Sequence, residues 1–144
     1  MESGWLLPDL TDDQACGFWE ATAREELCVQ RCSSCGARRM PPRPMCPECR
    51  SLESRWEAVS GDAKIWSFVV AHPPLLPAYA EWAPYPVVTV ELSEEPGLRM
   101  VGNLVRTAAG AINEVPVAEI EIGLPVRVVF AAIDDVKLPR WCLT

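Results

Sequence analysis

The sequence predicts a mainly β protein with an N-terminal helix, a small metal-binding ribbon and a five-stranded barrel. Fourteen prolines and eight glycines among 144 residues argue against a helical bundle and suit short strands joined by turns. Two Cys-x-x-Cys pairs are separated by ten residues, a spacing typical of a metal site. Several runs rich in β-branched and aromatic residues follow these pairs, as expected for strands.

The first 27 residues are predicted to form an arm and a helix. Residues 1–10 include Trp5, Leu6 and Leu7, which we expect to pack on a partner or on the domain itself. Thr11 is a suitable N-cap, and two aspartates follow it near the positive end of the helix dipole. Apolar residues then recur at helical spacing: Ala15, Phe18, Trp19, Ala23 and Leu27. The pattern predicts a helix over about 11–27, with its stripe on the domain or on a partner subunit.

Residues 28–54 are predicted to form a rubredoxin-like zinc ribbon. Each Cys-x-x-Cys pair can form a tight knuckle, and two knuckles supply a closed tetrahedral set of soft ligands that suits structural Zn²⁺. Iron and a redox dithiol pair are the alternatives. Gly36 permits the positive φ that such a knuckle needs. The four expected ligands are Cys32, Cys35, Cys46 and Cys49. The other three cysteines are expected to be small buried apolar residues: Cys16, Cys28 and Cys142.

Residues 55–144 are predicted to form an OB-fold domain with a C-terminal tail. A turn at Gly61-Asp62 is expected between the first two strands, and Gly102 is expected to bulge or bend a later one. About five strands in this length favour a small closed barrel, and a β-sandwich is the alternative. The predicted strands span residues 55–60, 63–72, 87–93, 98–107 and 124–130, the last extending towards Ile133.

The charge distribution is uneven. The chain carries a net charge of −7, which argues against non-specific binding to nucleic acid. The window 31–55 holds six arginines and two glutamates and carries +4, so the remainder carries −11, the difference between −7 and +4. The arginines form either an anion site or a solvated surface that offsets the thiolate charge.

The expected location is the cytoplasm, and no membrane association is expected. No segment approaches the roughly 20 apolar residues of a membrane helix. The first residues, MESGWLLPDLTDD, lack the positive charge and the long apolar run of a secretory signal. Seven cysteines without an export signal indicate a reducing compartment.

The sequence offers no convincing catalytic group. His72 is its single histidine and is expected to be structural or at the surface. The loop 73–86 contains five prolines, which are expected to exclude regular structure. It also carries apolar and aromatic side chains, including Tyr79 and Trp82, so it is expected to contact a partner or an apolar ligand, or else to fold back over the barrel mouth.

These segments, in this order, resemble the DUF35 family of zinc-ribbon and OB-fold proteins associated with acyl-CoA. The resemblance spans about residues 14–134 and rests on FWEA, LCVQRCSSCG, CPEC, SGDAKIWSF, VAHPP, PYPVVTVEL and IGLPVRVVF. One departure is SGDA at 60–63, where the family pattern has a second glycine two places after Gly61.

The resemblance implies a non-catalytic accessory subunit that bridges subunits and helps to bind acyl-CoA. The ending LPRW at 138–141 and the aromatic loop are most similar to members paired with thiolase-like aldolases of steroid side-chain degradation. Those complexes cleave a β-hydroxyacyl-CoA by a retro-aldol step. Arginines near the ribbon suit CoA phosphates. The residues expected to contact acyl-CoA or the partner are Arg38, Arg39, Arg43, Tyr79 and Trp82.

Three alternatives remain at this stage. A partner subunit of a MaoC-like enoyl-CoA hydratase belongs to the same family context. A single-stranded nucleic-acid-binding module is possible because ribbons and OB-folds both bind nucleic acid, although the aromatic residues here gather in a proline loop. A self-sufficient enzyme ranks last because no catalytic constellation is recognisable.

Overall fold

The computed structural model of the protein describes residues 4–144 and contains two β-sheets with one helix between them. The small sheet has the order β2-β1-β3, formed by β1 (Cys28–Cys32), β2 (Arg38–Arg39) and β3 (Ser54–Ala58). The large sheet is a closed barrel of order β4-β5-β6-β8-β7. Its strands are β4 (Asp62–Ala71), β5 (Tyr85–Leu92), β6 (Arg99–Val105), β7 (Pro125–Ile133) and β8 (Val136–Leu143). The predicted mainly β fold with a five-stranded barrel is confirmed.

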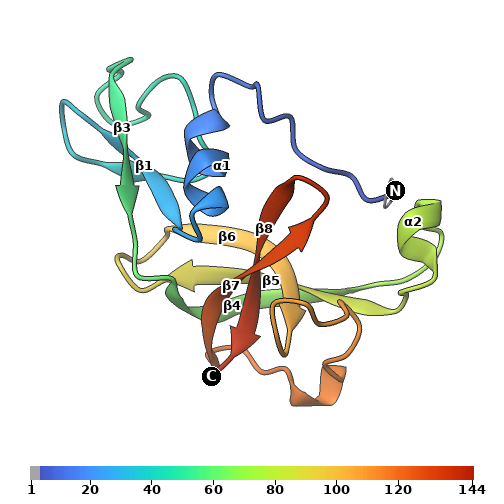
Figure 1. Ribbon diagram of the computed structural model, residues 1–144. Coiled ribbons are helices and arrows are strands. Elements are labelled where there is room, and N and C mark those ends of the chain that lie inside the picture. Colours follow the sequence, from blue (N-terminus) through green and yellow to red (C-terminus); the bar gives the residue numbers. More distant parts are fainter. Residues whose placement is uncertain (1–3) are drawn as a thin grey trace.

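Helix α1 (Cys16–Ala23) lies between the small sheet and the barrel, and the arm before it runs across the molecule towards α2 (Pro77–Ala80) (Figure 1). The prediction of a helix over 11–27 was too long at both ends. Side-chain oxygens of Asp9 and Asp12 accept hydrogen bonds from nearby backbone amides and hold the preceding residues in turns. The helix ends at Ala23, and Glu25 has φ +60.

Two strand assignments made from the sequence were wrong. The segment expected as the first barrel strand is β3, which pairs with β1 from Cys28↔Ala58 to Cys32↔Ser54. The segment expected as a C-terminal tail is β8, which closes the barrel between β6 and β7. Its pairing with β6 is parallel, at Leu104↔Trp141, so a long connection separates the two strands. That connection contains the short 3₁₀ helix η1 (Val117–Glu119).

The barrel core is filled around Trp141, which is 1% exposed. Gly102 does not bulge its strand, because β6 pairs with β5 in unbroken register. A Cβ at Gly102 would lie 3.0 Å from the indole Cδ1 of Trp141, so the glycine makes room for the ring. The bulge lies instead in β4, between Ile65 and Ser67. Ala63, where the family pattern has glycine, sits in regular register opposite Leu92.

Gly61 turns the chain from the ribbon into the barrel. Its φ is +83, and an added Cβ would lie 2.5 Å from Cγ1 of Val128. Its carbonyl oxygen accepts a hydrogen bond from the Val128 amide at 2.9 Å. The positive φ and the close approach of Val128 both require glycine here. Of the turn predicted at Gly61-Asp62, Gly61 turns the chain as expected, whereas Asp62 is already the first residue of β4.

The loop 73–86 contains one regular turn, α2, which begins at Pro77. Proline is tolerated in the first turn of a helix because the missing amide has no helical partner there. The prediction that five prolines exclude regular structure was therefore wrong for these four residues, and also for Tyr85 and Pro86, which begin β5.

Replacing Trp141 should strongly destabilise the barrel. Trp141→Ala is expected to lower the free energy of unfolding by about 3–5 kcal/mol, because a buried ring is lost and a cavity remains. Equilibrium urea denaturation with zinc present measures the change. The control is Trp66→Ala, since Trp66 is 46% exposed and stacks on Arg99, and its expected cost is about 1 kcal/mol or less. Equal losses in the two variants would contradict the core assignment.

Candidate functional site

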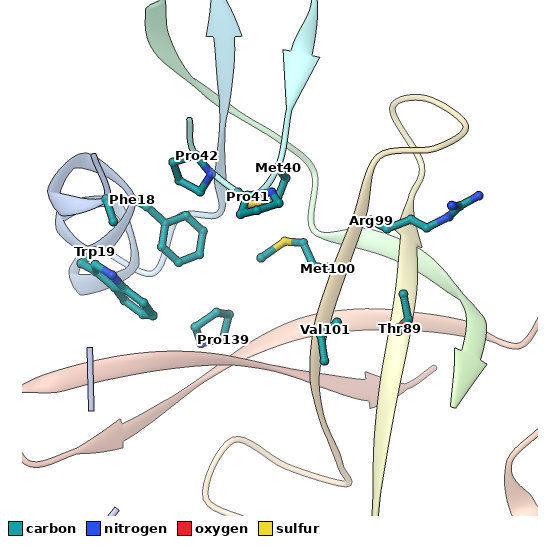
Figure 2. Close-up of a pocket in the computed structure, with 11 residues that line it drawn as sticks. Phe18, Trp19, Met40, Pro41, Pro42, Thr89, Arg99, Met100, Val101 and Pro139 are labelled. Atoms are coloured by element: carbon teal, nitrogen blue, oxygen red, sulfur yellow. The ribbon is translucent and has the colours of Figure 1, made fainter. Parts of the chain in front are cut away.

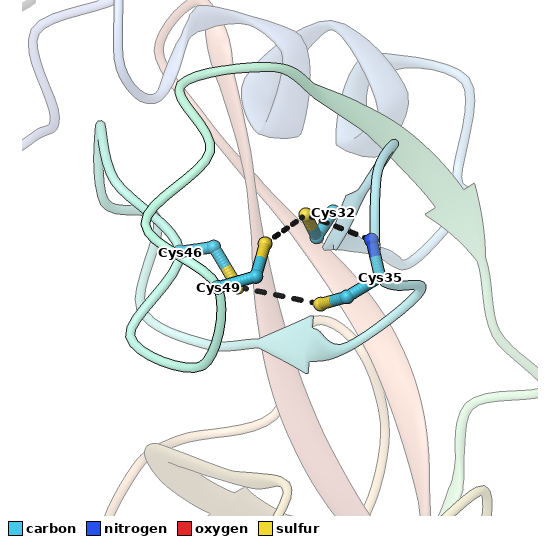
Figure 3. Close-up of side chains that lie close together, drawn as sticks. All are labelled: Cys32, Cys35, Cys46 and Cys49. Atoms are coloured by element: carbon cyan, nitrogen blue, oxygen red, sulfur yellow. Dashed lines mark hydrogen bonds between the residues drawn. The ribbon is translucent and has the colours of Figure 1, made fainter.

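The four cysteines of the two Cys-x-x-Cys pairs meet at one point of the ribbon (Figure 3). Their sulfur atoms all lie within 4.8 Å of one another. Sγ of Cys32 lies 3.5 Å from Sγ of Cys49, and Sγ of Cys35 lies 3.6 Å from Sγ of Cys46. Four sulfurs at about 2.3 Å from one tetrahedral zinc would be separated by about 3.8 Å. The donor set and its geometry therefore fit zinc, with no position left open for substrate.

Each knuckle is a tight turn that follows its first cysteine. In the first, the Gly36 amide donates to the Cys32 carbonyl at 3.0 Å, and Gly36 has φ +78, as predicted. In the second, the Arg50 amide donates to the Cys46 carbonyl at 2.9 Å, and Arg50 has φ +64. A non-glycine residue in this conformation is uncommon, which indicates that the second turn is held by its surroundings.

The sulfurs compete for negative charge. The backbone amide of Cys35 donates to Sγ of Cys32 at 3.4 Å, and this is the main reason that the pKa of Cys32 falls to about 6. The Ala37 amide acts to lower the pKa of Cys35, but desolvation and hydrogen bonds with the neighbouring sulfurs raise it to about 12. One thiolate is thus favoured at the expense of another. A divalent cation removes this competition because it binds all four as thiolates.

The remaining cysteines lie outside this cluster. Cys28 is buried in β1, and Cys16 and Cys142 are half-buried. The Cys142 thiol donates to the Arg106 carbonyl oxygen at 3.0 Å. Cys28 matches its prediction as a small buried residue, whereas Cys16 and Cys142 are less buried than expected.

Glu57 on β3 joins the three strands of the ribbon sheet. Its carboxylate accepts hydrogen bonds from Arg31 on β1 and from Nε of Arg38 on β2, the latter at 2.6 Å. These two guanidinium groups lower the pKa of Glu57, and Glu57 in turn raises that of Arg38. Arg38 also binds Glu95 in the β5–β6 turn at 3.1 Å. The network therefore ties the ribbon to the barrel.

The three arginines predicted to contact acyl-CoA or a partner occupy different environments. Arg38 is engaged with its two carboxylates. Arg39 is 4% exposed and donates two hydrogen bonds to the Arg43 carbonyl oxygen, at 2.9 and 3.2 Å. The side chain of Arg43 is exposed. Of the three, Arg43 is the one positioned to reach a ligand from solution.

An apolar cleft of about 410 Å³ lies where α1, the ribbon and the barrel meet. Figure 2 shows Phe18 and Trp19 on α1 and Met100 on β6 facing a common space, while Arg99 points away from it. The ribbon closes one side with Met40, Pro41 and Pro42. The other residues that line the cleft are Ala15, Thr89, Arg99, Val101 and Pro139. The helical stripe was expected to pack on the domain or on a partner subunit. Its part in forming a cleft depends on long-range contacts that the sequence pattern does not show.

The aromatic loop packs against the N-terminal arm. The rings of Trp5 and Tyr79 meet edge to face at 4.8 Å, and Trp82 lies 6.2 Å from Trp5. The Tyr79 hydroxyl accepts a hydrogen bond from the Leu6 amide at 3.0 Å. Tyr79 and Trp82 are thus half-buried at one end of the molecule. The exposed His72 lies between the end of β4 and the start of this loop.

Within residues 4–144, the cysteine cluster is the one group of three or more His, Cys, Asp or Glu side chains able to hold a metal. None of the helices in this part of the chain is long and apolar enough to cross a membrane.

Comparison with known proteins matches both parts of the fold. The family model of the C-terminal OB-fold domain of ChsH2 matches residues 56–131, and that of the ChsH2 rubredoxin-like zinc ribbon matches residues 19–54. A solved structure, the Ltp2-ChsH2(DUF35) aldolase, has a chain that superimposes with a TM-score of 0.78 at 32% identity. The match covers 94% of this chain and 98% of that one.

Two curated relatives carry hydratase names. The "Probable enoyl-CoA hydratase alpha subunit" of Thermomonospora curvata is 41% identical over 122 residues, and the 3-oxo-4,17-pregnadiene-20-carboxyl-CoA hydratase alpha subunit of Mycobacterium tuberculosis is 34% identical over 124. The matches cover 83% and 86% of this chain, but only 33% and 36% of the relatives. The chain therefore spans about a third of the length of these proteins.

Removing one ligand of the cluster should abolish metal binding. Cys46→Ser is expected to weaken zinc affinity by more than the roughly 10- to 100-fold typical of losing a group outside the coordination shell. Metal analysis of the purified protein should fall from one equivalent of zinc to a small fraction of one. Cys16→Ser, outside the cluster, is the matched control and should keep its zinc. Full zinc retention by the Cys46 variant would contradict the site.

The Glu57 network should stabilise the protein in a pH-dependent way. Because Arg31 and Arg38 lower the pKa of Glu57 in the folded state, its contribution is present above the ordinary glutamate pKa of about 4.3 and is lost as the pH falls through the lowered value. Glu57→Gln is expected to cost about 1 kcal/mol at pH 7, since the partners are partly exposed. The difference from wild type should vanish in acid.

Urea denaturation of both proteins across this pH range measures the difference. Protonation of the cysteine ligands affects both proteins alike, so it cancels in the difference between their free energies of unfolding. Glu53→Gln, at an exposed position on the same segment, controls for removal of a charge. A cost that is independent of pH would contradict the ion-pair explanation.

Proposed function

Because the chain belongs to the DUF35 family, we propose that it is a non-catalytic accessory subunit of a thiolase-like enzyme that cleaves a β-hydroxyacyl-CoA by a retro-aldol step. The observation that carries the proposal is the match to a chain of the Ltp2-ChsH2(DUF35) aldolase over almost the whole length of both. Steroid side-chain degradation is the proposed context, in line with the pregnadiene-carboxyl-CoA named for one relative. The proposed location is the cytoplasm, consistent with seven cysteines none of which forms a disulfide.

The division of chemistry follows from what the reaction needs. A retro-aldol step requires a base for the hydroxyl group and a site that stabilises the enolate. Within residues 4–144, His72 is the single histidine, and it is exposed at the end of a strand. The clustered cysteines form a closed set that leaves zinc no position for a substrate oxygen. In this proposal the reacting groups belong to the larger partner, and zinc stabilises the ribbon.

The apolar cleft is the proposed binding surface for the acyl portion of the ligand. Its walls of aromatic, methionine and proline side chains suit an apolar group such as a steroid ring system. Arg43 follows the cleft residue Pro42 directly in the chain and is exposed, so it is the proposed contact for a CoA phosphate. Arg38 and Arg39 are proposed to act indirectly, by holding the ribbon that presents Arg43. Tyr79 and Trp82 are proposed partner contacts.

A second candidate is a subunit of a MaoC-like enoyl-CoA hydratase. The hydratase alpha subunits identified above favour it, and one of them shares 41% of its aligned residues with this chain. Both candidates place the chain beside a catalytic subunit that acts on an acyl-CoA. They differ in the enzyme that copurifies and in the reaction that the complex performs.

Co-purification tests the proposal. Tagged protein recovered from its native source is expected to carry one equivalent of zinc and a stoichiometric thiolase-like subunit. The pair, and neither subunit alone, should release the aldehyde or ketone from a β-hydroxyacyl-CoA with a steroid side chain, as measured by chromatography. Recovery of a MaoC-like subunit with hydratase activity would support the second candidate. Recovery of nucleic acid, lost at high salt, would contradict both.

The complex also allows the ligand contact to be tested. Arg43→Ala is expected to weaken CoA-ester binding by about twofold to fivefold, because an ion pair at an exposed position contributes up to about 1 kcal/mol. Arg55→Ala, an exposed arginine elsewhere on the ribbon, is the matched control. Unchanged affinity in the Arg43 variant, with the complex intact, would overturn this contact and leave the accessory role standing.

A further inference from the structure

One arginine of the barrel is buried and has no counter-ion among the residues that the structure describes. Arg140 on β8 is 5% exposed, and its Nη1 donates a long hydrogen bond of 3.4 Å to the Gly110 carbonyl oxygen. Its Nε is buried and has no hydrogen-bond partner. Among residues 4–144, no carboxylate lies within ion-pair distance of it. The ring of Trp5 lies 5.6 Å from its Cζ.

Burying the guanidinium of Arg140 in this way costs free energy unless a further group balances its charge. Arginine keeps its proton in proteins, so burial leaves a full positive charge in a poorly solvated place. Desolvation lowers the pKa of Arg140, which is the sign of this cost. Arg38, by contrast, binds two carboxylates. Glu114, beside Gly110, is already engaged, because it accepts the Arg106 amide hydrogen at 2.6 Å.

A cavity lies beside the buried guanidinium. Its volume is about 280 Å³, and Arg140 forms part of its wall. Two tryptophans, Trp5 and Trp82, line one part, and small apolar residues of the segments 108–112 and 131–133 line the rest. The alanines and the glycine of these segments leave the space open, and Arg140 is the single charged residue among the residues of 4–144 that line it.

We propose that this cavity binds a carboxylate, with its charge on Arg140 and its apolar part against the alanines and tryptophans. A planar carboxylate can accept two parallel hydrogen bonds from a guanidinium, which would balance the buried charge of Arg140. A phosphate carries more charge than one arginine in an apolar wall can balance. The ligand class is therefore a compact monocarboxylate with an apolar body.

The carboxylate has two possible sources: a small organic acid in solution, or an acidic side chain of a partner subunit inserted into the cavity. The chemistry at Arg140 is the same for both. The inference does not rest on the proposed retro-aldol function, since the buried arginine and its cavity belong to this chain alone.

Nuclear magnetic resonance on the zinc-loaded, ¹⁵N-labelled chain tests the proposal. The Nε–H resonance of Arg140, identified by its loss in Arg140→Lys, is followed during titration with sodium butyrate and sodium benzoate. The expected result is a saturable shift. Butyramide and benzamide, which match these probes in shape but lack the charge, should respond at least tenfold more weakly. Arg127→Gln, at an exposed arginine of β7, should bind like wild type.

A second arm identifies the source of the carboxylate. If the free acids leave the isolated chain unchanged, the same resonance is recorded in the complex with the copurifying enzyme. A shift there, lost when one acidic residue of that enzyme is replaced by its amide, would support the proposal with the partner as the source. No shift in either arm would overturn it. Arg140→Lys is used only to assign the resonance; the titrations themselves are recorded on the wild-type chain.

Discussion

The ribbon depends on four sulfur atoms confined within 4.8 Å of one another. Without a cation they cannot all carry charge, as the opposite pKa shifts of Cys32 and Cys35 indicate. A ribbon sheet of three strands, one only two residues long, buries too little apolar surface to fold by burial alone. In the proposed zinc-bound state, the metal supplies the free energy that this small sheet cannot obtain from packing.

The position of the ribbon determines the cleft. Met40, Pro41 and Pro42 lie between the two knuckles in sequence, so their placement depends on both. The ion pair of Arg38 with Glu95 fixes the ribbon against the barrel, while Glu57 holds the three ribbon strands together. The charge excess seen in the sequence thus serves, in large part, internal contacts. Arg39 is the extreme case, since it is buried and directed at a backbone carbonyl.

The local parts of the fold were predictable, and the long-range parts were not. The zinc-ribbon spacing, the glycine at position 36 and the turn at Gly61 follow from short-range chemistry, and the structure bears them out. The end of the chain was expected to be a tail, but it forms β8, in which Pro139 is tolerated and pairs with Phe130. Arg140 looked like any charged residue, and its burial beside a cavity arises only when β8 closes the barrel. The cleft likewise combines three segments that no sequence window contains.

The cleft and the cavity at Arg140 suit different kinds of ligand. The cleft joins two folding units and offers apolar contact with an exposed arginine nearby, which suits a large ligand or a subunit surface. The cavity at Arg140 is smaller and carries one buried charge, so it selects for a single anionic group. The cleft depends on the ribbon, and hence on the metal, whereas the cavity is built from the arm, the proline-rich loop and the barrel. Loss of zinc should therefore disrupt the first surface more than the second, because the cavity shares no wall with the ribbon.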